Sequence, residues 1–391
     1  MNEIIFKYFC IVLFLSGCSV YKSDLQTAQC SGAKFDDGQR FTKAAEIKKS
    51  LDALVQRGVP GCSMAVYAND RWWTATSGLA KIEDQTPMQD CHLLYLQSVA
   101  KTYLAVAILK LYEQGKIDLD ASMTRYLPQK YSRYITGGMK ITVRMLLNHT
   151  SGIPEYNAVP AYITRLLQHP DHVFVPEDYL RYIEGKSLDF QPGAKYSYRN
   201  TNYLVLALIA DELTGDHARF LSETIFEPLE LRQTFYRNDS NYLKYPNLVN
   251  SYWDRHSDGI VENTSQLQRN NVMALVGDDG IVATPQDAVK FLKGLMEGKL
   301  LSDSSLQIMR SWVKDRQGNF TYGLGLDYAS FHGQTAYGHS GGGIGAGCQL
   351  YYFPEKNIYV FVGINLGTVT DSPLHDAVSK TVDKIYEVLL K

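Results

Sequence analysis

The sequence predicts an α+β protein in which a central antiparallel sheet, flanked by helices, is interrupted by a mostly helical insertion. Strand patterns occur near both ends of the 391-residue chain, at 62–78 and 333–367, whereas helical patterns dominate the middle, 116–290. The connections between the strands are short, and short connections require antiparallel pairing because a parallel crossover needs a dozen or more residues. The strands at the two ends are therefore expected to share one sheet.

The N-terminal part of the predicted sheet domain, 41–115, has the pattern of a helix, two strands and a second helix. A helix over 42–56 is expected because its apolar residues fall on one face. The strands CSMAVYA and RWWTATSG follow, and Asn69-Asp70 between them favours a hairpin turn. The segment 98–114 is apolar nearly all round, which predicts a buried helix.

The C-terminal part of the sheet domain, 291–391, predicts a meander followed by a helix. Three strand patterns, GQTAYGHSG, AGCQLYYF and NIYVFVGINLG, are separated by turns too short for a parallel crossover. From Asp376 onward the apolar residues lie on one helical face, so this helix is expected to cover the sheet. Between the two parts, 116–290 is expected to form a mostly helical domain, with a catalytic cleft between it and the sheet domain.

The N-terminal stretch MNEIIFKYFCIVLFLSGCSV is typical of a secretory signal, because a lysine precedes an apolar run too short to span a bilayer. The run ends in Leu-Ser-Gly-Cys, which resembles a bacterial lipobox. We therefore expect a lipoprotein signal peptide over 1–17, lipidation of Cys18 and a tether over 18–40. Ser19 resembles the sorting signal of outer-membrane lipoproteins and predicts a periplasm-facing protein held at the membrane by its lipid. An ordinary cleaved signal or a buried helix is the alternative.

Charge and cysteine content narrow the possible partners. The net charge is −2 and the basic residues are scattered, so no nucleic-acid partner is expected. No cysteine or histidine pattern typical of a metal site occurs, and His169 and His172 flank a proline in a predicted loop, so no cofactor or metal is expected. Besides Cys10 and Cys18, four cysteines allow one disulfide, with the pairing left open: Cys30, Cys62, Cys91 and Cys348.

The stretch GHSGGG, 338–343, fits the G-x-S-x-G pattern of an α/β-hydrolase nucleophile elbow around Ser340. Such an elbow needs a helix directly after the serine, with the acid and histidine partners on later strands. Asp371 and His375 do follow, but glycines and a strand pattern come directly after Ser340, and too few residues remain for crossover helices. We therefore expect Ser340 not to be the nucleophile.

A better candidate nucleophile opens the buried helix predicted over 98–114. Ser98 and Lys101 are three residues apart, so on a helix they lie on the same face, with a base within reach of a hydroxyl. The helix N-terminus also favours developing negative charge. The other S-x-x-K matches in the chain lack this context. An N-cap serine with a surface lysine is the alternative, which a lysine one turn into an apolar helix disfavours.

Two further motifs follow in chain order. YRN, 198–200, lies in a loop directly before a helical pattern, and HSG, 339–341, is the one H-x-G in the chain. The ordered set S-x-x-K, Y-x-N and H-x-G is similar to the penicillin-recognising serine hydrolases, which include class C β-lactamases, DD-peptidases and related esterases. LLNHTSGIPEY, FEPLELRQTFY and GDDGIVATPQDAVKFL support this resemblance, which covers most of the mature chain and implies a β-lactamase/transpeptidase-like fold.

The resemblance also implies a role for each motif. Ser98 would be the attacking hydroxyl, while Lys101 either takes its proton or stays charged and lowers the pKa of Tyr198. The base is therefore left as a coupled pair. The expected site has Ser98, Lys101 and Tyr198 as catalytic residues, Asn200, His339, Gly341 and Gly342 as substrate-binding residues, and the backbone N–H groups of Ser98 and Gly342 as the oxyanion hole.

Two departures from the family pattern bear on specificity. His339 stands where β-lactamases of this fold typically have the lysine of K-T-G, and a histidine is charged only below about pH 6.5 unless its pKa is shifted. It should therefore anchor a substrate carboxylate less securely. Asp278 and Asp279 stand where small residues are usual. They could repel carboxylate substrates or pair with a basic residue, and their role is left open.

The resemblance implies hydrolysis through an acyl-enzyme of a peptide, amide or ester bond. The substrate would be a small molecule or a peptidoglycan peptide, and a DD-carboxypeptidase or penicillin-binding-type activity is the first expectation. A carboxylesterase or a weak class C-like β-lactamase is the alternative among enzymes. Outside enzymes, the alternative is a non-catalytic cell-wall-binding lipoprotein that keeps the fold.

Overall fold

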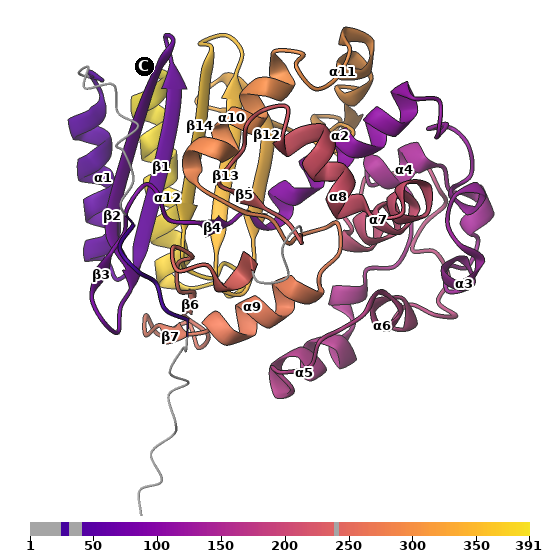
Figure 1. Cartoon of the computed structure of the whole chain (residues 1–391), viewed down its shortest axis with the longest axis horizontal. Coiled ribbons are helices and arrows are strands. Elements are labelled where there is room, and N and C mark those ends of the chain that lie inside the picture. The colour runs from indigo at the N-terminus through magenta and orange to yellow at the C-terminus, as the bar shows by residue number, and fades with distance from the viewer. Residues whose placement is uncertain (1–24, 31–40, 238–241) are drawn as a thin grey trace, which may run out of the picture.

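The computed structural model describes residues 25–30, 41–237 and 242–391 (Figure 1). Its largest element is a nine-stranded sheet in the order β3-β2-β1-β14-β13-β12-β11-β10-β9, with antiparallel neighbours throughout. Helices cover both faces, which gives the predicted α+β class. The strands are β1 (Gly61–Ala68), β2 (Arg71–Lys81), β3 (Thr86–Pro87), β9 (Val313–Lys314), β10 (Phe320–Tyr322), β11 (Asp327–Phe331), β12 (Gln334–Gly342), β13 (Gly347–Phe353) and β14 (Ile358–Ile364).

Strands from the two ends of the chain lie side by side within this sheet. β1 pairs with β2 on one side and with β14 on the other, so that Met64 lies opposite both Ala75 and Val362. In the turn between β1 and β2, Asn69 and Asp70 have φ of 51° and 59°, the left-handed values that suit a tight hairpin turn. The expectation that both ends share one sheet is confirmed.

Two helices from the chain ends cover one face of the sheet. α1 (Ala44–Gln56) and α12 (Pro373–Leu390) lie beside each other in Figure 1 and bury their apolar sides against β1, β13 and β14. α12 begins before Asp376, where the sequence pattern placed its start. The Ser372 side chain accepts a hydrogen bond from the His375 N–H, and Pro373 suits the first turn of a helix, so the helix is capped there.

The opposite face of the sheet is continuous with the helical region. α10 (Pro285–Met296) lies on β1, β13 and β14, while α2 (Ala100–Glu113) packs against α7 (Asn200–Thr214) and α8 (His217–Leu221). One apolar cluster extends from Phe361 of β14 through α2 to α7. α10 therefore belongs to the sheet layer. It starts at Pro285, slightly before residue 290, where the sequence placed the end of the helical domain.

The segment between α2 and α10 is mostly helical, with short strands among the helices. Its other helices include α3 (Gln129–Ser132), α4 (Val143–Leu147), α5 (Pro160–Gln168), α6 (Pro176–Arg181) and α9 (Ser265–Ala274). In this segment β8 (Val282–Ala283) and β5 (Thr234–Phe235) form a small sheet with β4 (Leu94–Tyr95), which precedes α2, and β6 (Tyr252–Trp253) pairs with β7 (Glu262–Asn263). After α10, α11 (Asp303–Met309) leads to the outer strands of the large sheet.

Residues 25–30 lie against the body of the protein, although they belong to the segment expected to be a tether. The Thr27 hydroxyl donates to the Leu248 carbonyl at 2.6 Å, and Cys30 forms a disulfide with Cys91, 61 positions further on. The pairing that the sequence left open is thus Cys30 with Cys91, while Cys62 and Cys348 are buried thiols. The predicted signal peptide, 1–17, and the lipidation site Cys18 lie outside the described residues.

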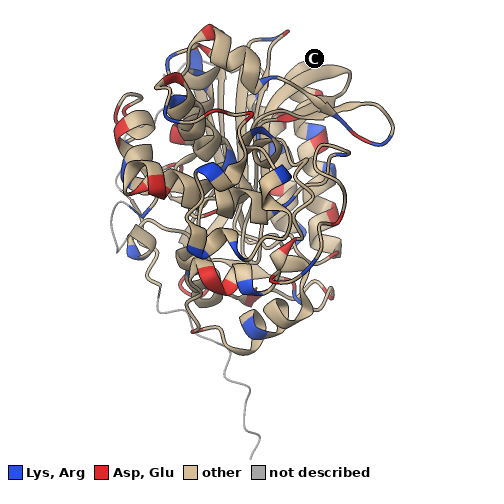
Figure 2. Ribbon diagram, turned by 90° about the vertical axis from the view of Figure 1, so that its right-hand side faces the viewer, with Lys and Arg blue, Asp and Glu red and all other residues tan. Residues whose placement is uncertain are grey.

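Charged residues of both signs are interspersed along the helices and loops on the side that Figure 2 presents. Neither sign gathers into a broad single-sign face there, in agreement with the small net charge. Among the described residues, no helix is both long enough and apolar enough to cross a bilayer.

Candidate active site

Ser98 and Lys101 meet at the start of α2. A single 3₁₀ turn, Gln97–Val99, leads into the helix, and Ser98 is partly exposed whereas Lys101 is completely buried. The Lys101 ammonium donates to Ser98 Oγ at 2.9 Å and to the backbone carbonyl of Asp278 at 2.7 Å. Burial lowers the pKa of Lys101, against the opposing effect of nearby carboxylates led by Asp278. The structure therefore places a lysine that loses its proton more easily than usual beside a hydroxyl.

Tyr198 stands next to this pair. The Lys101 nitrogen lies 5.1 Å from the centre of the Tyr198 ring. Burial raises the pKa of Tyr198 well above its ordinary value, although the nearby Ser98 hydroxyl acts in the opposite direction. A phenolate base would require a lowered pKa, so the raised pKa of Tyr198 argues against Tyr198 as the base. Of the two alternatives for the base, the geometry favours Lys101, with Tyr198 remaining a phenol.

A cavity of about 430 Å³ opens in front of Ser98, and Asn200 and Gly342 border it as well. Asn200 begins α7, so the loop before that helix places its side chain at the cavity wall. The cavity thus joins Ser98, the expected nucleophile, to Asn200, an expected substrate-binding residue, and to Gly342, an expected oxyanion residue. The remaining lining residues are Gln97, Tyr156, Asn157, Tyr162, Ile163, Leu166, Leu167, Trp253, Asn271, Leu275, Asp278, Asp279, Gly343, Ile344 and Val369.

His339 and Gly341, the other residues expected to bind the substrate, are not among the residues that border this cavity. His339 is buried, with Nε2 2.9 Å from the Tyr322 hydroxyl and Nδ1 2.6 Å from the Ser340 carbonyl oxygen. Because a carbonyl only accepts, Nδ1 carries the proton and Nε2 accepts from Tyr322. Burial lowers the pKa of His339, which keeps the ring neutral. At Gly341, a Cβ would lie 2.4 Å from the Leu96 carbonyl oxygen, so only glycine fits there.

Ser340 has the surroundings of an exposed strand residue. It lies opposite Gln349 in the ladder between β12 and β13, and its N–H donates to Asp327. An antiparallel strand follows it, so the strand-turn-helix arrangement of a nucleophile elbow is absent at this place. Ser340 and His375 border a separate cavity of about 280 Å³ on the α12 side, but no hydrogen bond joins these two residues in the described structure.

Two residues that the sequence pattern did not single out support the site from behind. His149 is buried, accepts the Arg199 N–H at 3.1 Å, and its ring centre lies 4.3 Å from that of Tyr198. Glu155 accepts the backbone N–H of Asn200, and burial raises the pKa of this carboxyl to about 7. Both lie in LLNHTSGIPEY, which supported the family resemblance, but nothing in their spacing pointed to these contacts.

Asp278 and Asp279 are buried in the wall of the cavity beside Ser98. The Asp278 carboxylate accepts from the Tyr156 hydroxyl at 2.8 Å, and the Asp279 carboxylate accepts from the Gly280 N–H at 2.6 Å. Burial raises the pKa of both carboxyls, that of Asp279 to about 7. The sequence left two roles open for these residues, namely repelling carboxylate substrates or pairing with a basic residue. Among the described hydrogen bonds, neither carboxyl is bonded to a basic side chain.

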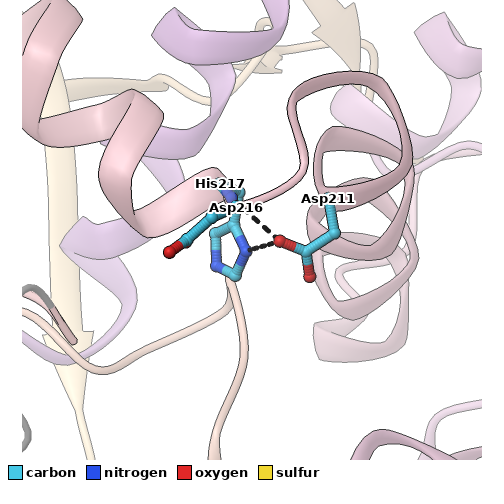
Figure 3. Close-up of side chains that lie close together, drawn as sticks. All are labelled: Asp211, Asp216 and His217. Atoms are coloured by element: carbon cyan, nitrogen blue, oxygen red, sulfur yellow. Dashed lines mark hydrogen bonds and ion pairs between the residues drawn. The ribbon is translucent and has the colours of Figure 1, made fainter.

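A histidine-carboxylate cluster lies away from this cavity, where α7 turns into α8 (Figure 3). Its possible ligand atoms, from Asp211, Asp216 and His217, lie within 4.8 Å of one another. His217 bonds Asp211 through Nδ1 at 2.6 Å and Tyr236 through Nε2 at 2.7 Å, and Asp216 caps α8 by accepting two backbone N–H groups. The cluster therefore fixes the corner between the two helices.

The fold and the arrangement around Ser98 agree with the comparison with protein families. The family model described as Beta-lactamase matches residues 41–380, so the chain belongs to the β-lactamase family. It is 26% identical over 340 residues to "Penicillin-binding protein 4*" of Bacillus subtilis, covering 83% of this chain and 72% of that protein. It is 30% identical over 281 residues to "Putative penicillin-binding protein PbpX" of the same organism, covering 71% of this chain and 64%, less than two thirds, of that protein.

Solved structures show the same β-lactamase/transpeptidase-like fold. A D-stereospecific amidohydrolase from Streptomyces sp. is 26% identical with a TM-score of 0.74, and the match covers 88% of this chain and 98% of that one. The D-amino acid amidase from Ochrobactrum anthropi SV3 is 24% identical with a TM-score of 0.77, covering 89% and 98%. The fold predicted from the motifs is confirmed, within a superfamily of serine hydrolases.

Proposed function

We propose that the protein is a serine hydrolase that forms an acyl-enzyme on Ser98 with a peptide, amide or ester substrate. The observation that carries this proposal is the 2.9 Å contact between the buried Lys101 nitrogen and Ser98 Oγ. Once neutral, Lys101 can accept the hydroxyl proton as Ser98 attacks, because its pKa is lowered by burial. Asn200 and Gly342 border the same cavity and would orient the substrate and its developing oxyanion.

The proposed reaction needs only water, the substrate and the groups of this site. The Ser98 oxygen forms a bond to the acyl carbon, the bond from that carbon to the leaving nitrogen or oxygen breaks, and the leaving group departs with the proton taken from Ser98. Water then hydrolyses the ester on Ser98, and Lys101 serves again as the base. Tyr198, which stays protonated, stands beside Lys101 and could pass a proton to the leaving group.

The comparison with penicillin-binding relatives supports testing DD-carboxypeptidase activity, while the D-stereospecific amidohydrolase supports testing amides in D and L forms. A carboxylesterase, a weak β-lactamase and a non-catalytic wall-binding protein are separated by one measurement. Intact-mass analysis after incubation with penicillin, a short-chain p-nitrophenyl ester and a fluorophosphonate reports the acylated species. A penicilloyl adduct that persists favours the peptidase, and hydrolysis of penicillin with an adduct that does not persist favours the β-lactamase. Turnover of the ester without a penicilloyl adduct favours the esterase, and absence of every adduct favours a binding role.

The decisive variants are Ser98→Ala and its matched control Ser340→Ala. We expect Ser98→Ala to abolish fluorophosphonate labelling and to lower ester hydrolysis by at least about a thousandfold, because the variant lacks the hydroxyl to which Lys101 is hydrogen-bonded. In Ser340→Ala, fluorophosphonate labelling and ester hydrolysis should both stay within a few-fold of the wild-type values. Labelling that persists in Ser98→Ala would contradict the proposal. Loss of labelling in Ser340→Ala alone would instead support Ser340 as the nucleophile of an α/β-hydrolase elbow.

We further propose that the protein is anchored through a lipid on Cys18 and faces the periplasm at the outer membrane. The support is the lipobox-like Leu-Ser-Gly-Cys at the end of the apolar leader. Growth with a radioactive fatty acid should label the wild type, and Cys18→Ser should lose the label and leave the membrane fraction. A Cys18→Ser protein that stays labelled would contradict the anchor.

A further inference from the structure

The described N-terminal segment, 25–30, begins beside α9, on the edge of the molecule where α5, α9, β6 and β7 lie along the bottom of Figure 1. The Asn250 amide donates to the Leu25 carbonyl at 3.2 Å, and the Asn250 side-chain oxygen accepts from Ser265, the first residue of α9, at 2.9 Å. Leu25 also belongs to the same buried apolar cluster as Val272 of α9. Leu25 therefore marks the edge at which the preceding chain joins the body.

The chain before Leu25 is short enough to keep this edge close to a membrane. A hydrogen bond from Thr27 and the disulfide of Cys30 fix residues 25–30 to the body. Cys18, the proposed lipid-bearing residue, precedes Leu25 by seven positions, and seven residues span at most about 25 Å. A lipid on Cys18 therefore keeps Leu25 within about 25 Å of the membrane surface.

Three exposed apolar side chains border the active-site cavity at this edge. Ile163 and Leu167 of α5 and Val369, after β14, line the cavity and are exposed at the surface. Ile163 and Leu167 are four residues apart on a helix, so they lie on one face. Thr370, next to Val369, accepts from Trp253 of β6 at 2.7 Å, which places Val369 near the same edge. We call Ile163, Leu167 and Val369 the apolar rim.

α5 is held on α9, so the apolar rim has a fixed place relative to Leu25. Leu166 of α5 packs against the apolar cluster that contains Leu267 of α9, and Asn270 of α9 donates to the Pro170 carbonyl at 2.8 Å. The ten residues of α9 give it a length of about 15 Å, less than the span of about 25 Å available before Leu25. The proposed lipid and the apolar rim can therefore meet one membrane surface at the same time.

The charges of α5 and α9 suit lipid headgroups. Neither helix contains an acidic residue, and each carries one arginine, Arg165 in α5 and Arg269 in α9. Anionic headgroups attract basic side chains and repel acidic ones. An exposed apolar patch with basic residues nearby is typical of surfaces that bind membranes.

We propose that the apolar rim lies against the membrane that holds the lipid of Cys18, so that the cavity beside Ser98 opens toward the bilayer surface. Ile163 and Leu167 enter the headgroup region, and the lipid on Cys18 keeps this edge of the protein in place. A substrate then reaches Ser98 from the membrane surface. This inference rests on the proposed lipid anchor.

Quenching by brominated lipids tests this orientation. The full-length lipidated protein is placed in vesicles of phosphatidylethanolamine and phosphatidylglycerol, with a thiol-linked fluorophore on Leu167→Cys or, as the control, on Met139→Cys. Met139 is exposed and does not border the cavity, while Cys62 and Cys348 are buried thiols that should not be labelled. Brominated acyl chains should lower the fluorescence at position 167 by about half or more and leave position 139 nearly unchanged. Equal quenching at both positions, or none at 167, would overturn the inference.

A charge on the apolar rim should weaken its contact with the bilayer. With the fluorophore on Val369→Cys, the added substitution Ile163→Glu should lower the quenching by about threefold or more, because a carboxylate is costly within the bilayer. Met139→Glu is the matched control, since it makes the same change at an exposed apolar residue outside the rim, and it should keep the quenching. Thermal melting checks that both variants fold. A folded Ile163→Glu protein with unchanged quenching would overturn the inference.

Fatty-acid labelling separates this inference from the anchor on which it rests. A wild-type protein that takes up the radioactive fatty acid, but whose position 167 is not quenched in vesicles, keeps the anchor and loses this orientation. If that protein also dimerises in detergent solution, the apolar rim belongs to an interface with a second copy instead. A wild-type protein that takes up no fatty acid loses both the anchor and the orientation.

Discussion

Ser98 and Ser340 both have a basic side chain close in the sequence, Lys101 and His339, yet the structure gives them opposite surroundings. Ser98 opens a helix, where a residue three positions on shares its face, and Lys101 reaches it at 2.9 Å. Ser340 lies in a strand, where neighbouring side chains point to opposite faces, so His339 is buried while Ser340 is exposed. A serine and a base that are adjacent in the sequence form a reactive pair only if the secondary structure brings them to one side.

We expect the largest loss of activity from removing Lys101, the basic residue that contacts Ser98. In Lys101→Ala, Ser98 loses its base, and we expect kcat/KM for a p-nitrophenyl ester to fall by about 10²–10⁴-fold. Lys110→Ala is the matched control, because Lys110 lies at the other end of α2 and is partly exposed. Thermal melting of both variants separates loss of the base from loss of folding. A folded Lys101→Ala protein with near wild-type activity would show that another group is the base.

The pH profile of Tyr198→Phe should show which member of the pair ionises. If Lys101 is the base it must be neutral, so activity rises with pH and levels off above its pKa, which burial places below the ordinary value for lysine. Tyr198→Phe should lower kcat/KM by about tenfold or somewhat more, through loss of proton transfer, and keep this rise with pH. A variant whose activity no longer depends on pH would assign the ionisation to Tyr198.

The sequence predicted the elements that depend on local periodicity and left open those that depend on distant contacts. The buried α2, the hairpin at Asn69 and the C-terminal meander follow from patterns within a few residues. The spacing of Ser98 and Lys101 predicted their contact for the same reason. In contrast, Lys101 donates to the carbonyl of Asp278, which lies 177 residues further along the chain. The spacing of residues in a sequence does not predict such a contact.

The substrate side of the site was also harder to predict than the nucleophile. His339 was expected to touch the substrate because its motif resembles that of the family. The structure places its ring centre 6.1 Å from that of Tyr198, but the side chain is buried and bonds Tyr322, which the spacing of the motif did not predict. Gln97, directly before Ser98, has a φ of 50° and a buried amide nitrogen without a hydrogen-bond partner among the described residues, and its residue type predicted neither feature.

Gly342 offers a smaller perturbation at the cavity edge of β12. A Cβ at this position would lie 2.4 Å from Thr368 Oγ1, so Gly342→Ala should displace the strand end. We expect kcat to fall by roughly tenfold, because displaced oxyanion donors stabilise the transition state less well. Thr368→Ala removes the colliding oxygen, and the double variant should regain most of the loss. A double variant as slow as Gly342→Ala would mean that the added methyl acts on the substrate itself.

The smallest effect is expected at His339, which tests whether the base-like residue beside Ser340 takes part in catalysis. In His339→Gln the side-chain oxygen can still accept from the Tyr322 hydroxyl, so stability should fall by only about 1 kcal/mol and kcat/KM by less than about threefold. Because burial already keeps the ring neutral, the ratio of variant to wild-type activity should be the same at about pH 6 and about pH 8. A ratio that changes between these pH values would mean that a charged His339 contributes to substrate binding, and would restore to β12 the role that its motif suggested.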